Sequence, residues 1–264
     1  MRLSAVTIQK FRNFVEPQRI DVEEDVTALV GKNESGKTTV LKALHRLNPA
    51  NGEGRKFNLV TEYPRWRLIS DQRTSDLTKV RPVSAEFVLD EGDIEALADV
   101  LPASLPVETI VHVARNYGNE FFVYPRAPFQ VVVRAAGRAA AMDDEDIEAL
   151  VAEGSLKAAV PRAKEMAKEL KESAAPRAKA LSAFAGQAEK HSFLLFGGNI
   201  LEQDAANALA KRVPKFFYFS NYSLLPGQTD LTVLAQKVED GEDLEEEEQT
   251  VLSLLAHAQV EPST

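Results

Sequence analysis

Gly31-Lys32-Asn33-Glu34-Ser35-Gly36-Lys37-Thr38-Thr39 is the stretch of sequence that decides the fold of this chain. Its spacing of Gly, four residues, Gly-Lys and then Ser or Thr is that of a phosphate-binding loop. Residues 25–30 before the loop are predicted to form a buried strand, and the apolar positions in residues 40–47 after it repeat with the period of a helix. A strand that enters a helix through a glycine loop is the setting in which this spacing binds phosphate.

The residue types of this loop suit a magnesium-bound triphosphate. Gly31 and Gly36 let the backbone bend so that its N–H groups converge on the phosphates, helped by the positive end of the following helix. Lys37 is expected to reach the β- and γ-phosphates, and the Thr38 hydroxyl to take one coordination position on Mg²⁺. A glycine-rich turn that matches by chance is the alternative, which the flanking strand and helix disfavour. The predicted binding residues are Gly31, Lys32, Asn33, Glu34, Ser35, Gly36, Lys37, Thr38 and Thr39.

Composition bounds the class of protein. The 264 residues are enough for one large domain or two smaller ones, and 44% hydrophobic with 27% charged residues is typical of globular proteins. The net charge of −9 argues against nonspecific nucleic-acid binding through overall charge, although a local basic face stays possible. The absence of cysteine excludes disulfides and thiolate zinc sites. No apolar run reaches the ~18 residues that span a bilayer, so we expect a cytoplasmic protein without membrane contact.

The rest of the sequence predicts an α/β fold with a mixed sheet and a helical insertion. Apolar alternation predicts strands at residues 2–11, 19–22, 83–89, 109–114, 120–124, 129–135 and 215–219. Because hairpin turns join several of these segments, we expect an antiparallel sheet beside a parallel core that contains the loop. Helices are predicted at residues 93–101, 204–212 and 251–257, in addition to the one after the loop.

Three domains are predicted from these elements. Residues 1–142 form the nucleotide-binding lobe with its antiparallel sheet, and residues 214–264 contain the return strand and the C-terminal helices. Residues 143–213 form the helical insertion, which Pro161 and Pro176 are expected to divide into segments.

Charge patterns in the insertion have ordinary explanations and one alternative. Residues 155–190 hold eight Lys or Arg against four Asp or Glu, a pattern typical of a solvated helical face. Contact with a nucleic acid is the alternative. The acidic residues 143–146 could suggest a metal site, but acids at the positive end of a helix explain them better.

The first 48 residues resemble a known family. A strand followed by Phe11-Arg12-Asn13-Phe14, a second strand, the loop and then Leu41-Lys42-Ala43-Leu44 resembles the N-terminal lobe of the ABC-type P-loop ATPases of chromosome maintenance, the SMC, RecF and OLD-type (overcoming lysogenisation defect) proteins. Glu34 stands where SMC-like members usually carry glycine, so the resemblance is closest to the OLD-type ATPases.

The resemblance implies a site for ATP and Mg²⁺. It implies that Lys37 takes part in catalysis and that Arg12 and Asn13 lie near the adenine and the phosphates. It also implies a glutamine, after a strand, that completes the magnesium shell and senses the γ-phosphate. Gln228 is our candidate because it follows the predicted strand at residues 215–219, and a helix-capping role is its alternative. Two weaker candidates, Gln72 and Gln130, lack that setting.

The sequence departs from the family where hydrolysis is concerned. ABC-type hydrolysis also needs an apolar strand that ends in Asp-Glu and a Ser-Gly-Gly signature, and this sequence has neither. The two motifs have partial counterparts in the same order, Phe196-Gly197-Gly198-Asn199 for the signature and Ser220-Asn221 for Asp-Glu. Because the uncharged Ser220-Asn221 cannot take a proton from water or neutralise magnesium, we interpret this similarity as coincidence.

These observations predict the Mg-ATP-binding portion of an OLD/SMC/RecF-like ATPase that hydrolyses ATP only with elements from elsewhere. By resemblance, its partners are a second ATPase lobe or homodimer partner, DNA or RNA, and a possible nuclease, in DNA repair or anti-phage defence. Two alternatives stay open. A P-loop small-molecule kinase would transfer phosphate to an acceptor by itself, and an interaction module would bind ATP without turnover.

Overall fold

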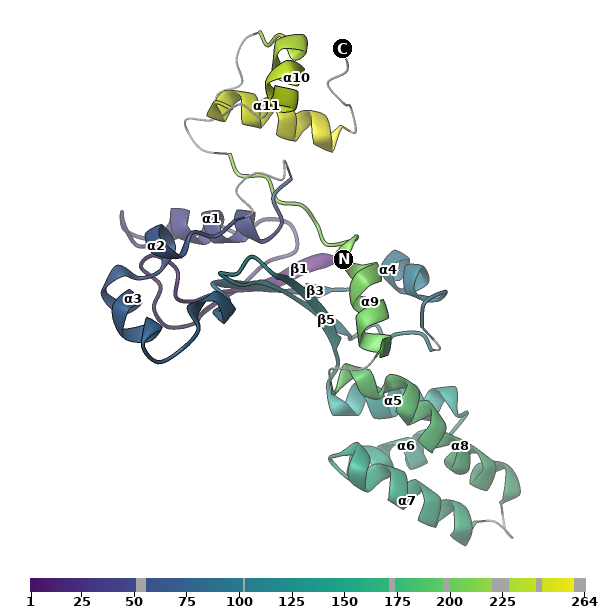
Figure 1. The fold of residues 1–264 in the computed structure, drawn as a ribbon. Helices are drawn as coiled ribbons and strands as arrows, with labels where there is room; N and C mark the ends of the chain where they lie inside the picture. The colour runs from purple at the N-terminus through teal and green to yellow at the C-terminus, as the bar shows by residue number, and fades with distance from the viewer. Residues whose placement is uncertain are drawn as a thin grey trace.

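The computed structural model describes residues 1–50, 56–101, 103–170, 174–196, 200–219, 228–240 and 244–258. In this part of the chain, a five-stranded sheet carries helix α1 over one face, and the helices α5 to α8 project away from the end opposite α1 (Figure 1). The helices between residues 59 and 97 and the helix at residues 200–210 flank the sheet, whereas the two helices at residues 231–240 and 246–257 lie beyond α1. The chain is therefore a mixed α/β protein.

The sheet is antiparallel throughout, in the order β2-β1-β3-β4-β5. Its strands are β1 (Arg2–Ile8), β2 (Gln18–Asp21), β3 (Val83–Val88), β4 (Ile110–Arg115) and β5 (Phe121–Arg126). The alternation in β3 shows why they form, since Val83, Ala85 and Phe87 are buried while the residues between them are partly exposed. The strands predicted near residues 2–11, 19–22, 83–89, 109–114 and 120–124 are confirmed.

Helix α1 (Lys37–Leu47) packs Val40, Ala43 and Leu47 against the apolar face of the sheet. At its C-terminal end, the buried Arg115 of β4 donates from Nε and Nη2 to the Leu47 carbonyl oxygen, each at 3.1 Å. A guanidinium satisfies helix-end carbonyls and complements the negative end of the helix dipole. The position of α1 on the sheet is thus fixed by both its buried face and its capped end.

The segment before the phosphate-binding loop does not form the predicted buried strand. Residues 25–30 have no strand assignment, and Val26 and Val30 are 80% and 93% exposed. A strand needs a neighbour for its backbone N–H and C=O groups, and none of the five described strands pairs with this segment. Among the described residues, parallel pairing is limited to the bridge between Pro49 and Phe216, so the predicted parallel core is wrong for this part of the chain.

Two other predicted strands are also wrong. Residues 129–135 belong to helix α5 (Phe129–Ala139), in which Val132, Val133 and Ala136 share a buried face. The run of β-branched valines suggested a strand, but packing of this helical face overrides their preference. Residues 215–219 form only the single bridge at Phe216, although Phe217 and Phe219 stack with ring centroids 6.3 Å apart.

A second core lies within the helices α5, α6 (Asp144–Val151), α7 (Leu156–Glu169) and α8 (Ala175–His191). It contains Leu150, Leu181 and Phe184, surrounded by alanines. Pro161 lies inside α7 instead of dividing it, whereas Pro176 lies in the first turn of α8 as expected. We call these four helices the arm.

The arm leaves and rejoins the sheet at neighbouring points. The backbone N–H of Ala127, just after β5, donates to the Leu194 carbonyl oxygen in the 3-10 turn η2 (Ser192–Leu194) at 3.2 Å. Helix α9 (Ile200–Ala210) then buries Ala205 and Leu209 in the first core. Beyond it, Arg212 pairs at 2.5 Å with the buried Asp93 of α4 (Glu91–Leu97). The helices predicted near residues 93–101 and 204–212 are thus confirmed.

The other elements are short. Helices α2 (Leu59–Glu62) and α3 (Arg65–Gln72) and the 3-10 turn η1 (Leu77–Lys79) precede β3, and α10 (Leu231–Asp240) and α11 (Glu246–His257) follow the first core along the chain. A helix at residues 251–257 is confirmed by α11. Within the described residues, no helix has the length and apolar character that crossing a bilayer requires. The three predicted domain boundaries stay predictions.

Candidate functional site

A pocket of about 370 Å³ lies at the N-terminal end of α1. It is lined by six predicted binding residues from the loop and α1, together with one residue from the turn after β1: Asn33, Glu34, Gly36, Lys37, Thr38, Thr39 and Asn13. The start of a helix presents free backbone N–H groups and a positive dipole end, which suit an anion. The structure therefore brings most of the predicted phosphate site to one place.

The Lys37 side chain crosses the loop in the structure. Its ammonium donates to the carbonyl oxygens of Gly31 and Lys32 at 2.8 Å and 2.7 Å. These bonds use two of its three N–H donors and keep the charge at the pocket. Gly31 and Lys32 do not line the pocket themselves, and neither does Ser35, whose backbone N–H donates to the Lys32 carbonyl oxygen at 3.3 Å.

Gly36 is the residue that the local geometry requires before α1. Its φ of +99° lies in the left-handed region that favours glycine. A Cβ there would lie 2.8 Å from Asn13 Nδ2 and 2.9 Å from the Phe14 ring. The turn after β1 thus packs directly against the loop, and the absence of a side chain at Gly36 is what allows this approach.

The turn that carries Asn13 has an unusual backbone. Phe11 and Phe14 exchange two backbone hydrogen bonds of 2.9 Å, which close a two-residue loop at Arg12 and Asn13. Lys10 and Arg12 have φ values of 49° and 52°, and such left-handed conformations cost about 1 kcal/mol or more for residues other than glycine. Neighbouring groups must therefore hold this turn in place.

Glu62 is one such group. This carboxylate is only 3% exposed and lies 2.8 Å from Arg46 of α1 and 3.7 Å from Arg12. Its Oε2 accepts from the Asn58 backbone N–H at 2.9 Å, and its backbone oxygen accepts from the Arg12 N–H at 2.6 Å. Because a buried carboxylate needs such partners, Glu62 joins the turn to the P-loop helix.

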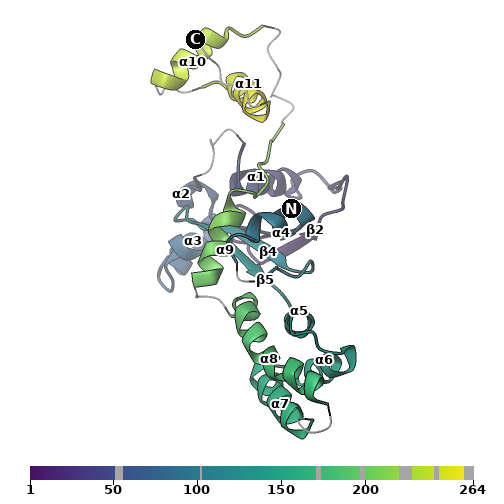
Figure 2. The same cartoon turned by 90° about the vertical axis from the view of Figure 1, so that its right-hand side faces the viewer.

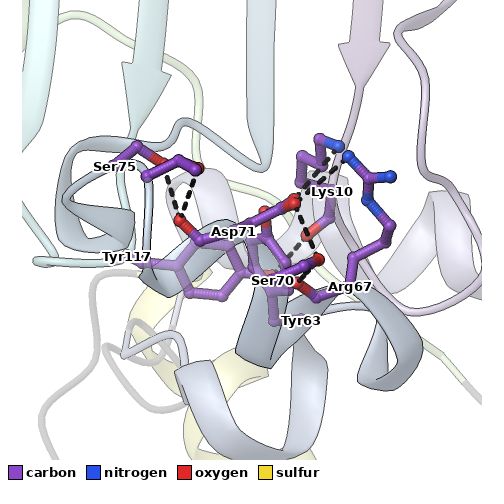
Figure 3. Close-up of polar contacts among 8 residues, drawn as sticks. Lys10, Tyr63, Arg67, Ser70, Asp71, Ser75 and Tyr117 are labelled. Atoms are coloured by element: carbon purple, nitrogen blue, oxygen red, sulfur yellow. Dashed lines mark hydrogen bonds and ion pairs between the residues drawn. The ribbon is translucent and has the colours of Figure 1, made fainter.

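Asp71 is the second group behind the turn (Figure 3). Its carboxylate accepts from the Tyr63 hydroxyl at 2.7 Å and lies 3.4 Å from Lys10 Nζ and 3.1 Å from Arg67. The hydroxyl of Tyr117 donates to the Lys10 carbonyl oxygen at 2.7 Å. The Tyr63 hydrogen bond, followed by the Lys10 ammonium, holds the pKa of Asp71 at about 2, below the ordinary value of 3.8. Burial raises the pKa of the Tyr63 phenol.

These contacts predict a pH-dependent contribution to stability. Because the pKa of Asp71 is lower in the folded state than 3.8, its ionised form stabilises the fold above about pH 4, and this contribution disappears as the pH falls toward 2. We expect Asp71→Asn to lower the free energy of unfolding at pH 6 and to lose its effect near pH 2. Urea unfolding of both proteins between these pH values measures the difference.

Asp99→Asn is the matched control, because Asp99 is exposed and has no ion pair or hydrogen bond among the described residues. It is expected to change the free energy of unfolding little. A difference between wild type and Asp71→Asn that grows as the pH falls would contradict the assigned role of the carboxylate.

Sequence reasoning missed the residues behind the turn. The sequence predicts no helix or strand in residues 58–72, whereas the structure forms α2 and α3 there, with Glu62 and Asp71. Glu62 lies four residues after Asn58, whose side chain accepts from the backbone N–H groups of Val60 and Thr61 as the N-cap of α2. An asparagine directly before the apolar Leu59 is a local helix-start signal that was available in the sequence.

Several predicted residues lie apart from the pocket. Arg12 is adjacent to the lining residue Asn13 but does not line the pocket. The three candidate glutamines, Gln228, Gln72 and Gln130, do not line it either. Gln228 is exposed before α10, and its magnesium role stays a prediction. Residues 197–199 and 220–227, which contain most of the partial counterparts of the signature and Asp-Glu motifs, lie outside the described residues. The acids at 143–146 begin α6, where Asp146 pairs with Arg177 at 2.6 Å.

Comparison with known proteins shows which family contains this fold and pocket. The family model described as AAA ATPase domain matches residues 1–193, which include the sheet, the phosphate-binding loop and the arm. No curated protein matches the chain. Since the matched residues make up well over half of the sequence and contain the pocket at the start of α1, the chain belongs to the AAA ATPase domain family.

Proposed function

We propose that this chain is the Mg-ATP-binding part of an ATPase that acts on DNA or RNA, and that hydrolysis requires residues from another segment or chain. The observation that carries the proposal is the pocket at the N-terminus of α1, where Lys37 and Thr38 face the same space within an AAA ATPase domain. A cationic tip and backbone N–H groups at a helix start are suited to bind a triphosphate.

The residues of the pocket have separable roles in this proposal. The Lys37 ammonium exchanges its bonds to loop carbonyls for bonds to the β- and γ-phosphates. The exposed Thr38 hydroxyl fits Mg²⁺, which prefers oxygen ligands and commonly takes one or two protein groups with phosphates and waters. When bound, the ion neutralises phosphate charge. Asn13 supplies amide donors from the turn, and Gln228 remains our candidate for a further magnesium contact.

The surroundings of the loop support the proposal that hydrolysis requires residues from another segment or chain. Val26, Val30 and Leu41 expose apolar side chains on both sides of the loop, with exposed fractions of 80%, 93% and 46%. A strand before a phosphate-binding loop is ordinarily buried among parallel strands. A strand that pairs with residues 25–30 and ends in acids would cover these side chains and bring the missing groups for activation of water.

The finer role follows the resemblance of residues 1–48 to OLD-, SMC- and RecF-like ATPases. On this basis we propose a role in DNA repair or anti-phage defence, with a second ATPase lobe or a second copy as partner and a possible nuclease in the assembly. ATP then acts as a clamp, since a γ-phosphate shared between two lobes stabilises their closed arrangement.

Calorimetry with a phosphate-release assay on the purified chain tests the proposal. We expect Mg-ATP and Mg-ADP to bind and AMP to bind much more weakly, because the pocket offers its charge to the outer phosphates. We expect phosphate release at the background rate. Rapid turnover by the chain alone would disprove the need for added residues, and phosphate transfer to a small acceptor would indicate a kinase. Absence of ATP binding would disprove the proposal that this chain binds Mg-ATP.

A further inference from the structure

The arm carries a groove between α7 and α8 that the proposed nucleotide site does not use. The groove has a volume of about 600 Å³. Lysines from both helices line it, together with alanines and one serine: Lys164, Lys168, Lys179, Ala167, Ala175, Ala178 and Ser182. Lys164 and Lys168 lie one turn apart on α7, and Lys179 faces them from α8. Small side chains between the helices let them pack closely, which places two lysines of α7 and one of α8 on either side of one groove.

The three lysines have no partner within the protein, as far as the structure describes it. All three are exposed, and none forms an ion pair or a side-chain hydrogen bond with a described residue. The arginines of the same helices differ in this respect. Arg162 lies 3.5 Å from Glu165, and Arg177 forms a bidentate salt bridge with Asp146 through hydrogen bonds of 2.6 Å and 2.7 Å. Of the five lysines of α7 and α8, none of which has an ion-pair partner among the described residues, three therefore line this one groove, whereas Lys157 and Lys190 lie outside it.

This local charge contrasts with the rest of the molecule. The chain has a net charge of −9, yet residues 155–190 hold eight Lys or Arg against four Asp or Glu. A confined basic surface on an acidic protein selects polyanions locally, since distant charges are screened beyond about 10 Å at ordinary salt. Backbone positions four apart on a helix are separated by about 6 Å along its axis, close to twice the 3.4 Å rise per nucleotide of a DNA strand.

We propose that Lys164, Lys168 and Lys179 bind the phosphate backbone of a nucleic acid. This inference rests on the proposed function, to which it adds the surface that contacts the nucleic acid. Lysine contacts to phosphates position a nucleic acid without reading its bases, so the binding is independent of sequence. Helices α7 and α8, which line the groove, lie far from α1 in both views (Figures 1 and 2), so nucleotide binding and nucleic-acid binding can be measured separately.

Fluorescence anisotropy with a labelled DNA duplex and the matching single strand, both of mixed sequence, tests the proposal on the full chain. The test variant is the triple change Lys164→Glu, Lys168→Glu and Lys179→Glu. The control is Lys56→Glu, Lys79→Glu and Lys211→Glu, which changes exposed lysines outside the arm. Each triple variant changes the net charge by −6, from −9 to −15. The two variants therefore differ in where the charge changes and not in how much.

We expect the wild-type chain to bind DNA with an affinity that falls as NaCl rises from about 50 to 200 mM. The groove variant should weaken binding by more than about tenfold and reduce the log–log salt slope by about 2.7, which corresponds to three lost phosphate contacts. The control variant should bind nearly as wild type does. Binding of Mg-ATP should be the same in all three proteins.

Three results would overturn the proposal. The first is a wild-type chain that binds neither DNA probe at low salt, and the second is an equal loss of binding in both variants. The third is a groove variant whose DNA binding is unchanged while its sedimentation shows a new oligomeric state, because the groove would then be a protein interface. Loss of Mg-ATP binding in every protein would count against the proposed function and leave a DNA-binding result readable by itself.

Discussion

Replacing Lys37 by alanine should reduce the affinity for Mg-ATP by about 100-fold, which corresponds to about 2.7 kcal/mol of binding free energy. Lys37 is the one cation among the described residues that line the pocket at the start of α1. Its ammonium already lies at this pocket, because it donates to the carbonyl oxygens of Gly31 and Lys32. Isothermal titration of both proteins with Mg-ATP measures the loss.

Lys32→Ala is the matched control for this prediction. Lys32 belongs to the same loop and is exposed, but it does not line the pocket and contributes a backbone oxygen to Lys37. We expect its affinity for Mg-ATP to stay within a few-fold of wild type. Thermal unfolding of both variants should remain close to wild type, since both side chains lie at the surface. An unchanged affinity of Lys37→Ala would show that the loop does not bind the triphosphate as proposed.

Replacing Gly36 by alanine should both destabilise the protein and impair nucleotide binding. The φ of +99° makes a side chain strained at this position, and the added Cβ would meet the Phe14 ring at 2.9 Å and Asn13 Nδ2 at 2.8 Å. Strain and overpacking together are expected to lower the free energy of unfolding by about 2 kcal/mol. Because the turn has to move away from the loop, we also expect weaker Mg-ATP binding. Urea unfolding and calorimetry measure the two effects.

Gly186→Ala provides a control for which the free energy of unfolding is expected to change in the opposite direction. Gly186 is exposed in α8, and a Cβ built there meets nothing within 4 Å. Alanine is favoured over glycine inside a helix by about 0.5–1 kcal/mol, so this variant should be slightly more stable than wild type. If Gly36→Ala were as stable as Gly186→Ala, the close contact between the turn and the loop would be absent in solution.

The sequence was informative where one segment contains its own signal. The loop, α1 and the strands with clear alternation could be predicted, because the glycine spacing and the apolar periods are local patterns. The strand predicted at residues 25–30 has an equally clear apolar pattern, but a strand also needs a neighbour. The described part of the chain offers none, and Val30 is exposed.

The supports of the candidate site could not be predicted because they depend on contacts distant in sequence. Arg115 caps α1 from 68 positions away, and Lys10 meets Asp71 from 61 positions away. No local pattern reports such pairings. The left-handed backbone of Arg12 is likewise a result of its surroundings, since arginine has no preference for that conformation.

The hydrogen bond between Ala127 and Leu194 bears on how the molecule could change in length. It joins a residue shortly before the four-helix arm to one shortly after it. A segment that replaced the arm would therefore have to connect two backbone positions about as close together as the ends of a tight turn. Arms of different size, or none, could be grafted at this junction with little loop-closure cost. The proposed nucleotide pocket and the groove on the arm thus belong to parts of the chain that meet at one narrow junction.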